Sequence, residues 1–319
     1  MLERVKYSKL IGGLILFSMV FAGCVGGGSE INTANGLHKT GTIKPQTVTV
    51  YFSSSKGYMV PLTYSIGDAE DPVKLAIDKL LAGPSQDYLN RTIPEGTRLR
   101  DWCINDKTAI VDFTKEFLNV GGSADAMHAI NSLCLTLGGN PAIDNVQILI
   151  EGDVIKKIYG VSAGQPLQRS CVNYFECENP EHAYKVYFTD AYAMYMVPVT
   201  FSSEDDKDLP LKAMFKLISG PGKEGLTPTV WPGTRLLDLK IENGTAAVDF
   251  SKDVLGYGGG TTAENLFVKS VLLTLGQFPE VEQVQFLIEG EKMDLLPEGT
   301  DVSSPLKPPN QANMVVEGP

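Results

Sequence analysis

Histidines are the side chains best suited to acid–base chemistry near neutral pH, and this 319-residue chain has three of them. His38 and His182 lie in polar stretches without a regular hydrophobic period. His128 takes the place that Leu266 has in a second, similar segment, which favours a partly buried structural residue. The GxSxG, HExxH and CxxC motifs are absent from the sequence. We therefore expect a protein without catalysis, metal or cofactor.

A glycine-rich stretch, "GYGGGTT" from Gly256 to Thr262, precedes a predicted helix. Main-chain N–H groups at such a position can bind an anion. The stretch lacks the lysine of a phosphate-binding loop, and the similar segment earlier in the chain has only "VGGS" there. The pattern favours a flexible helix entry over a phosphate site.

Cys24 follows three basic residues and the apolar run "LIGGLILFSMVFAG", a pattern typical of a signal peptide. The run is shorter than the roughly 20 residues of a membrane-spanning helix, and small residues before the cysteine resemble a bacterial lipobox. We expect residues 1–23 to be removed and Cys24 to carry a lipid on the outer face of the cytoplasmic membrane. Residues 24–44 are then a flexible spacer. An ordinary signal peptide with a chance cysteine is the alternative.

Four further cysteines can pair in three ways outside the cytoplasm. Cys134 lies on the apolar face of a predicted helix and is expected to be a buried thiol. Cys103 alternates out of phase with its apolar neighbours and is expected to face away from the core. Cys171 and Cys177 could close a small disulfide loop, which the sequence leaves open.

The formal charge of the chain is −11, and it becomes −13 when a leader of net charge +2 is removed. Such an acidic protein is repelled by phosphate. Nucleic acid is therefore excluded as a partner, as is anionic lipid beyond the anchor itself.

The chain contains one long internal repeat. "TAIVDFTKEFL" from Thr108 returns as "TAAVDFSKDVL" from Thr245, and "KLLAGP", "GTRLRD" and "LTLGGNPAIDNVQILIEG" return with similar spacing. A duplication explains these matches. It predicts one domain over residues 45–168, a linker over 169–182, a second domain over 183–308 and a disordered tail over 309–319.

Each copy predicts the same elements: strand, strand, helix, strand, strand, helix, strand. A hairpin alternates apolar residues over 47–64, and Asp71 with Pro72 begins a helix in the first copy. Asn243-Gly244 marks the turn of a second hairpin. A second helix over 123–137, or 262–275, ends at a glycine suited to a left-handed cap. Elements with one apolar face each predict an α+β fold with two tandem two-layer sandwich domains.

The repeated aspartates, Asp112 and Asp249, point away from the core side of their strands. Arg98 lies on the partner strand of the first, as Arg235 does for the second. We expect two structural cross-strand ion pairs worth about 0.2–1 kcal/mol each. An interaction surface is the functional alternative.

The order of "VPLTYS", "KLLAGP", "GTRL", "AIVDFTKEFL", "LTLG" and "VQILIEG" resembles the GerM family and its GerMN, or sporulation and spore germination, domain. The likeness covers about residues 45–168 and 183–308. It implies a fold similar to the ring-building modules of secretion systems. It further implies a lipoprotein of the mother-cell membrane, active in sporulation and germination, that associates with the channel complex between mother cell and forespore.

The resemblance and the motifs together predict a non-catalytic scaffold or assembly factor with protein partners in the cell envelope. Homo-oligomers or rings are compatible with it. The alternative is a general envelope lipoprotein that binds peptidoglycan or assists a cell-wall hydrolase. Linker cysteines and Cys103 depart from the family pattern and leave the geometry between the domains open.

Overall fold

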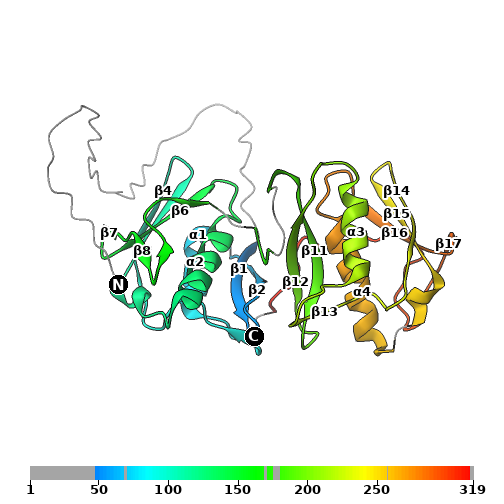
Figure 1. The fold of residues 1–319 in the computed structure, drawn as a ribbon, viewed down its shortest axis with the longest axis horizontal. Helices are drawn as coiled ribbons and strands as arrows, with labels where there is room; N and C mark the ends of the chain where they lie inside the picture. Colours follow the sequence, from blue (N-terminus) through cyan, green and yellow to red (C-terminus); the bar gives the residue numbers. More distant parts are fainter. Residues whose placement is uncertain (1–46, 68–69, 169–170, 175–179, 257, 317–319) are drawn as a thin grey trace, which may run out of the picture.

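The computed structural model describes residues 47–316, except 68–69, 169–170, 175–179 and 257. These residues form two similar halves that lie side by side (Figure 1). The predicted leader, the lipidation site Cys24 and the whole of the predicted spacer lie outside the described residues, so they stay predictions.

The first half follows the predicted order of main elements. They are β1 (Thr47–Ser54), β2 (Met59–Ser65), α1 (Pro72–Ala82), β4 (Leu99–Asn105), β5 (Thr108–Phe113), α2 (Ser123–Leu137) and β6 (Asn145–Ile150). The shorter strands are β3 (Leu89–Asn90), β7 (Asp153–Val154), β8 (Lys157–Ile158), β9 (Val161–Ser162) and β10 (Leu167–Gln168).

The second half repeats this order. Its main elements are β11 (Ala183–Asp190), β12 (Met196–Ser202), α3 (Leu209–Ser219), β14 (Leu236–Glu242), β15 (Thr245–Phe250), α4 (Gly260–Leu275) and β16 (Gln283–Ile288). Its short strands are β13 (Leu226–Thr227) and β17 (Glu291–Lys292). The structure thus confirms a mixed α/β fold in two tandem copies.

Each half has two main sheets with the helix pair between them (Figure 1), and in the first half β8 and β9 form a further two-stranded sheet. The sheet orders are β2-β1-β3 and β10-β6-β5-β4 in the first half, and β12-β11-β13 and β14-β15-β16-β17 in the second. Strands β5 and β6 are parallel, as are β15 and β16, because a helix connects each pair. Helices α1 and α2 both contact β1, and α2 also contacts β6. The first hairpin therefore covers the helices from the side opposite to the second sheet.

The local sequence explains how the helices begin and end. The carboxylate of Asp71 accepts the N–H groups of Val73 and Lys74 at 2.9 Å, and Pro72 occupies the first turn, where no N–H is needed. The predicted left-handed caps at Gly138 and Gly276 are wrong, since their φ angles are −67° and −68°. A glycine is needed at position 276 because Pro308 packs against it, and a Cβ there would lie only 2.3 Å from the Cβ atom of Pro308.

The prediction of a disordered tail is wrong for residues 309–316. Ala312 and Asn313 are buried, and the N–H of Val315 donates to the carbonyl of Thr63 at 2.8 Å. Met314 forms a parallel bridge with Thr63 of β2. The tail is ordered because it pairs with the edge of β2, which no other strand of its sheet bonds. Among the described helices, none combines the length and apolar character that crossing a bilayer requires.

Candidate functional site

The described residues contain no group of three or more His, Cys, Asp or Glu side chains that could hold a metal ion. His128 is half-buried against the turn between β1 and β2, where a Cβ on Gly57 would lie 3.3 Å from its Nε2 atom. His128 therefore has the partial burial that the sequence predicted.

The expected ion pair between Arg98 and Asp112 is not the one that forms. Asp112 accepts from Nη1 of Arg100 at 2.6 Å. An irregularity in the pairing of β4 with β5 falls between Leu99 and Asp101, so Arg100 occupies an extra position and reaches the carboxylate. Arg98 precedes β4, and its N–H donates to Oγ1 of Thr114 at 3.1 Å.

The second copy shows what the repeated aspartate does. Asp249 accepts the N–H of Gly290 at 2.9 Å, just as Asp112 accepts that of Gly152 at 2.9 Å. Among the described residues, no ion pair joins Arg235 to Asp249, and Leu237 stands where the first copy has Arg100. The aspartate therefore fixes the Glu-Gly turn that follows the neighbouring parallel strand, and the arginine is an addition of the first copy.

The structure bears on two of the cysteine predictions, the buried thiol of Cys134 and the outward position of Cys103. Burial raises the pKa of the Cys134 thiol to about 12, so this group is protonated and unreactive at neutral pH. Cys103 is half-exposed. Cys177 lies outside the described residues, and its disulfide with Cys171 stays a prediction.

The centre of the molecule is a joint between the two halves, built around two asparagines. Asn173 of the linker donates to the carbonyls of Met59 at 2.7 Å and Pro198 at 2.8 Å, and accepts the N–H of Met59 at 2.6 Å. Each half thus contributes one strand to the same side chain. We call this contact, with its counterpart at Asn313, the asparagine clamp.

The tail supplies the matching contact. Asn313 donates to the carbonyls of Met196 and Pro61, both at 2.8 Å, and accepts the N–H of Met196 at 2.8 Å. Met196 and Pro198 are the second-copy counterparts of Met59 and Pro61. The contacts of the two asparagines are equivalent. They indicate that an approximate two-fold axis relates the two halves, and that the linker and the tail occupy equivalent places.

Two tyrosines extend this symmetry. The hydroxyl of Tyr58 donates to the carbonyl of Glu224 at 2.8 Å, and that of its counterpart Tyr195 donates to the carbonyl of Asp87 at 2.9 Å. Each tyrosine hydroxyl thus bonds the main chain of the other half. The joint is consequently held by polar bonds from both sides, the one from Tyr58 being exposed and the one from Tyr195 half-buried.

One contact of the joint differs between its two sides. Lys56 binds the carboxylate of Glu224 at 2.5 Å, and this hydrogen bond lowers the pKa of Glu224. On the other side Tyr192 replaces Lys56, and its ring stacks on Tyr88 with centroids 4.2 Å apart. Because the ion pair is exposed, it adds little to stability.

Sequence reasoning missed both asparagines of the clamp. A signal was present, since "VN" follows "GQPL" in the first copy much as "AN" follows "SSPL" in the second. Both pairs lie outside the repeated domain motifs, in stretches that composition alone assigns to a linker and a tail.

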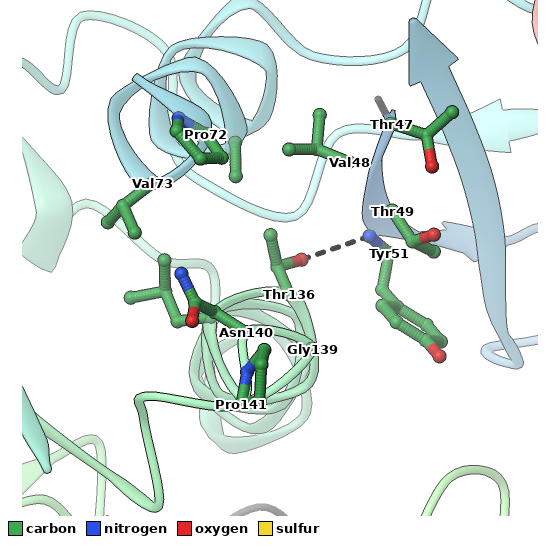
Figure 2. Close-up of a pocket in the computed structure, with 12 residues that line it drawn as sticks. Thr47, Val48, Thr49, Tyr51, Pro72, Val73, Thr136, Gly139, Asn140 and Pro141 are labelled. Atoms are coloured by element: carbon green, nitrogen blue, oxygen red, sulfur yellow. Dashed lines mark hydrogen bonds between the residues drawn. The ribbon is translucent and has the colours of Figure 1, made fainter. Parts of the chain in front are cut away.

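A pocket of about 320 Å³ opens in the first half between α1, the edge of β1 and the end of α2 (Figure 2). Val48, Val73 and Ala76 form its apolar side, and Thr136, Gly139 and Asn140 lie at the opposite side. Oγ1 of Thr136 accepts the N–H of Tyr51 at 3.0 Å, the bond drawn in the figure.

Comparisons with known proteins agree with the duplicated fold. The family described as "Germane: Sporulation and spore germination" matches residues 49–156 and again residues 185–294. The chain is 26% identical over 284 residues to the spore germination protein GerM of Bacillus subtilis (strain 168), a match covering 83% of this chain and 77% of that protein.

A solved structure extends the match to three dimensions. The tandem GerMN domains of the sporulation protein GerM from Bacillus subtilis align with a TM-score of 0.62 and 25% identity. The alignment covers 84% of this chain and 99% of that one. These findings confirm the resemblance seen in the repeated motifs. The chain belongs to the sporulation and spore germination family and carries two of its domains in tandem.

Proposed function

We propose that this protein is a non-catalytic assembly factor of sporulation and spore germination, held by a lipid on Cys24 at the outer face of the cytoplasmic membrane. The observation that carries the proposal is the joint: two family domains are fixed to each other by the asparagine clamp. Membership of the family supports the sporulation role.

A fixed pair of domains suits a scaffold. Directional hydrogen bonds to both halves, buried at Asn313 and half-buried at Asn173, favour one relative orientation, because a changed orientation loses them. The outer faces of the two halves are then presented at a constant spacing. Partners that bind both faces gain from this preorganisation.

The proposed partners are components of the channel complex between mother cell and forespore. A lipid anchor confines the protein to the membrane that holds such a complex, which raises the effective concentration of any weak contact. The acidic mature chain directs these contacts to neutral or basic protein surfaces.

The anchoring part of the proposal is tested with Cys24→Ala in sporulating host cells. The unchanged protein should sediment with membranes and gather at the engulfing membrane, whereas Cys24→Ala should be found mainly in the soluble fraction outside the cytoplasm. Equal sedimentation of the two proteins would contradict the anchor.

The assembly role is tested by pulldown from sporulating cells, with purified cell wall as the competing ligand. Retention of channel components by the unchanged protein, and their loss from an Asn173→Ala/Asn313→Ala variant, is the expected result. Binding to cell wall alone, or even vegetative expression without enrichment at the engulfing membrane, would favour a general envelope lipoprotein instead.

A further inference from the structure

The second half fills a space that the first half leaves open. After α4, the side-chain amide of Gln277 donates to the carbonyl of Lys185 at 2.6 Å and accepts its N–H at 2.7 Å. One carboxamide thus satisfies both main-chain groups of a residue on the edge of β11 that β13 leaves unpaired, since β13 pairs only with Thr189 and Asp190.

The first half has the same main-chain groups but no such side chain. Gly139 stands where the second half has Gln277, and Thr49 stands where it has Lys185. The neighbouring contacts are kept, because Thr136 accepts the N–H of Tyr51 just as Thr274 accepts that of Tyr187.

The pairing of β1 with β2 shows where the main-chain groups of Thr49 point. Residues that face each other in an antiparallel pair either bond each other or both point outwards. Thr49 faces Thr63, whose N–H and carbonyl bond Asn313 and Val315 beyond the far edge of β2. Thr49 therefore directs its N–H and carbonyl to the opposite edge, where it lines the pocket.

Two further differences enlarge the space. Asn140 replaces the buried Phe278, and Val48 replaces the buried Tyr184. Figure 2 shows the resulting opening, with Val48 and Val73 on one side and Asn140 and Gly139 on the other. The pocket of about 320 Å³ is where the second half places a glutamine and two aromatic rings.

The chemistry of the pocket selects its occupant. Every residue that lines it is uncharged, and Thr49 offers one donor and one acceptor side by side. A carboxamide matches both groups, whereas a carboxylate matches only the donor and an ammonium only the acceptor. Ligand pockets for drug-sized molecules span roughly 300–1,000 Å³, so this one suits one or two side chains.

We propose that this pocket binds a glutamine side chain, with an adjacent aromatic residue, presented by a partner polypeptide. The partner would do in trans what Gln277 and Phe278 do within the second half. The site is independent of the sporulation role, so either proposal can fail without the other.

The test uses the chain without its leader, residues 24–319, and a capped five-residue peptide copying residues 275–279, Leu-Gly-Gln-Phe-Pro. In amide NMR spectra we expect the peptide to shift Thr49 and its pocket neighbours saturably. A peptide with glutamate in place of the glutamine should bind at least about tenfold more weakly, because it cannot donate to the carbonyl of Thr49. Equal binding of the two peptides would overturn the proposal.

The second half supplies the matched control variant. Gly139→Gln combined with Asn140→Phe copies its residues into the pocket and should abolish the shifts while the fold is kept. Gly139 is not in the left-handed region, and a Cβ there lies 3.2 Å from the nearest atom, the carbonyl of Thr136. If this variant loses its structure, Val48→Tyr closes the pocket from the opposite side.

Two other outcomes would count against a partner polypeptide. Shifts that persist in the filled variants would place binding elsewhere. Shifts that appear only after removal of residues 24–46 would identify this chain's own spacer as the occupant.

Discussion

Equivalent residues of the two copies show which side chains the fold itself requires. Asp112 and Asp249 both accept the N–H of the glycine that follows the adjacent parallel strand. The glutamates of the same turns, Glu151 and Glu289, accept the N–H groups of Lys115 and Lys252 at 3.0 and 2.9 Å. The repeated Val-Asp-Phe and Ile-Glu-Gly motifs therefore depend on each other, and this explains why they recur together.

Other residues serve only one copy, and Lys269 of α4 is an example. Burial lowers the pKa of this half-buried lysine below its ordinary value of 10.5. The folded chain thus binds fewer protons than the unfolded chain in the interval between these two pKa values, so stability should rise with pH there. Below this interval the buried charge is destabilising.

The expected rise of stability with pH can be tested with Lys269→Met. The variant should be more stable than the unchanged protein at pH 7, and its advantage should shrink as the pH rises towards 10.5. Urea unfolding at several pH values measures the difference. Lys252→Met, at an exposed position, is the control variant measured beside it. A constant difference across this range would refute the explanation.

At the scale of elements, the turn of the second hairpin has different residues in the two copies, and the residues of the first copy strain its backbone. Asn243-Gly244 has φ angles of 50° and 79°, which these residues adopt readily. Asp106-Lys107 takes the same turn in the first copy with φ angles of 48° and 60°. A lysine in this left-handed region is strained by about 1–2 kcal/mol.

Lys107→Gly should therefore raise the free energy of unfolding by about 0.5–1 kcal/mol, after the flexibility of glycine offsets part of the relief. The exposed ion pair of Lys107 with Asp144, at 3.1 Å, is lost but contributes little. Gly244→Lys is the reciprocal change and should destabilise the second half. Urea unfolding measures both, and changes of the same sign would argue against turn strain as the cause.

Much of each element could be predicted from the sequence because local signals and the repeat agreed. Asp71, Pro72 and the spacing of apolar residues gave α1 its start, and α2 was expected over the residues where it occurs. The pairing of Arg100 could not be foreseen, since an irregular strand position depends on the partner strand. The order of the tail also depends on distant strand edges that its own composition does not reveal.

At the scale of the whole molecule, the asparagine clamp makes two small domains one unit. Asn313 bonds Pro61 in the first half and Met196 in the second, and its side chain is buried. The two halves should consequently unfold together, because unfolding either half also removes the clamp bonds and packing that stabilise the other.

Asn313→Ala should lower the free energy of unfolding by about 1–3 kcal/mol, since it leaves buried donors and acceptors of both halves without a partner. It should also split the single urea transition into two, one for each half. Asn265→Ala, at an exposed position of α4, should change little. A single transition with the stability of this control would show that the clamp does not couple the halves.

The place of Asn313 after the second domain has a consequence for biosynthesis. The first half can fold while the second is still being made, but the joint is complete only after residue 313, which follows the strands and helices of both halves, has emerged. A chain cut short before Asn313 would keep both domains and half of the clamp. The two halves of such a chain would be held together less firmly. Proteases that attack exposed strand edges should therefore cleave it faster than the full chain.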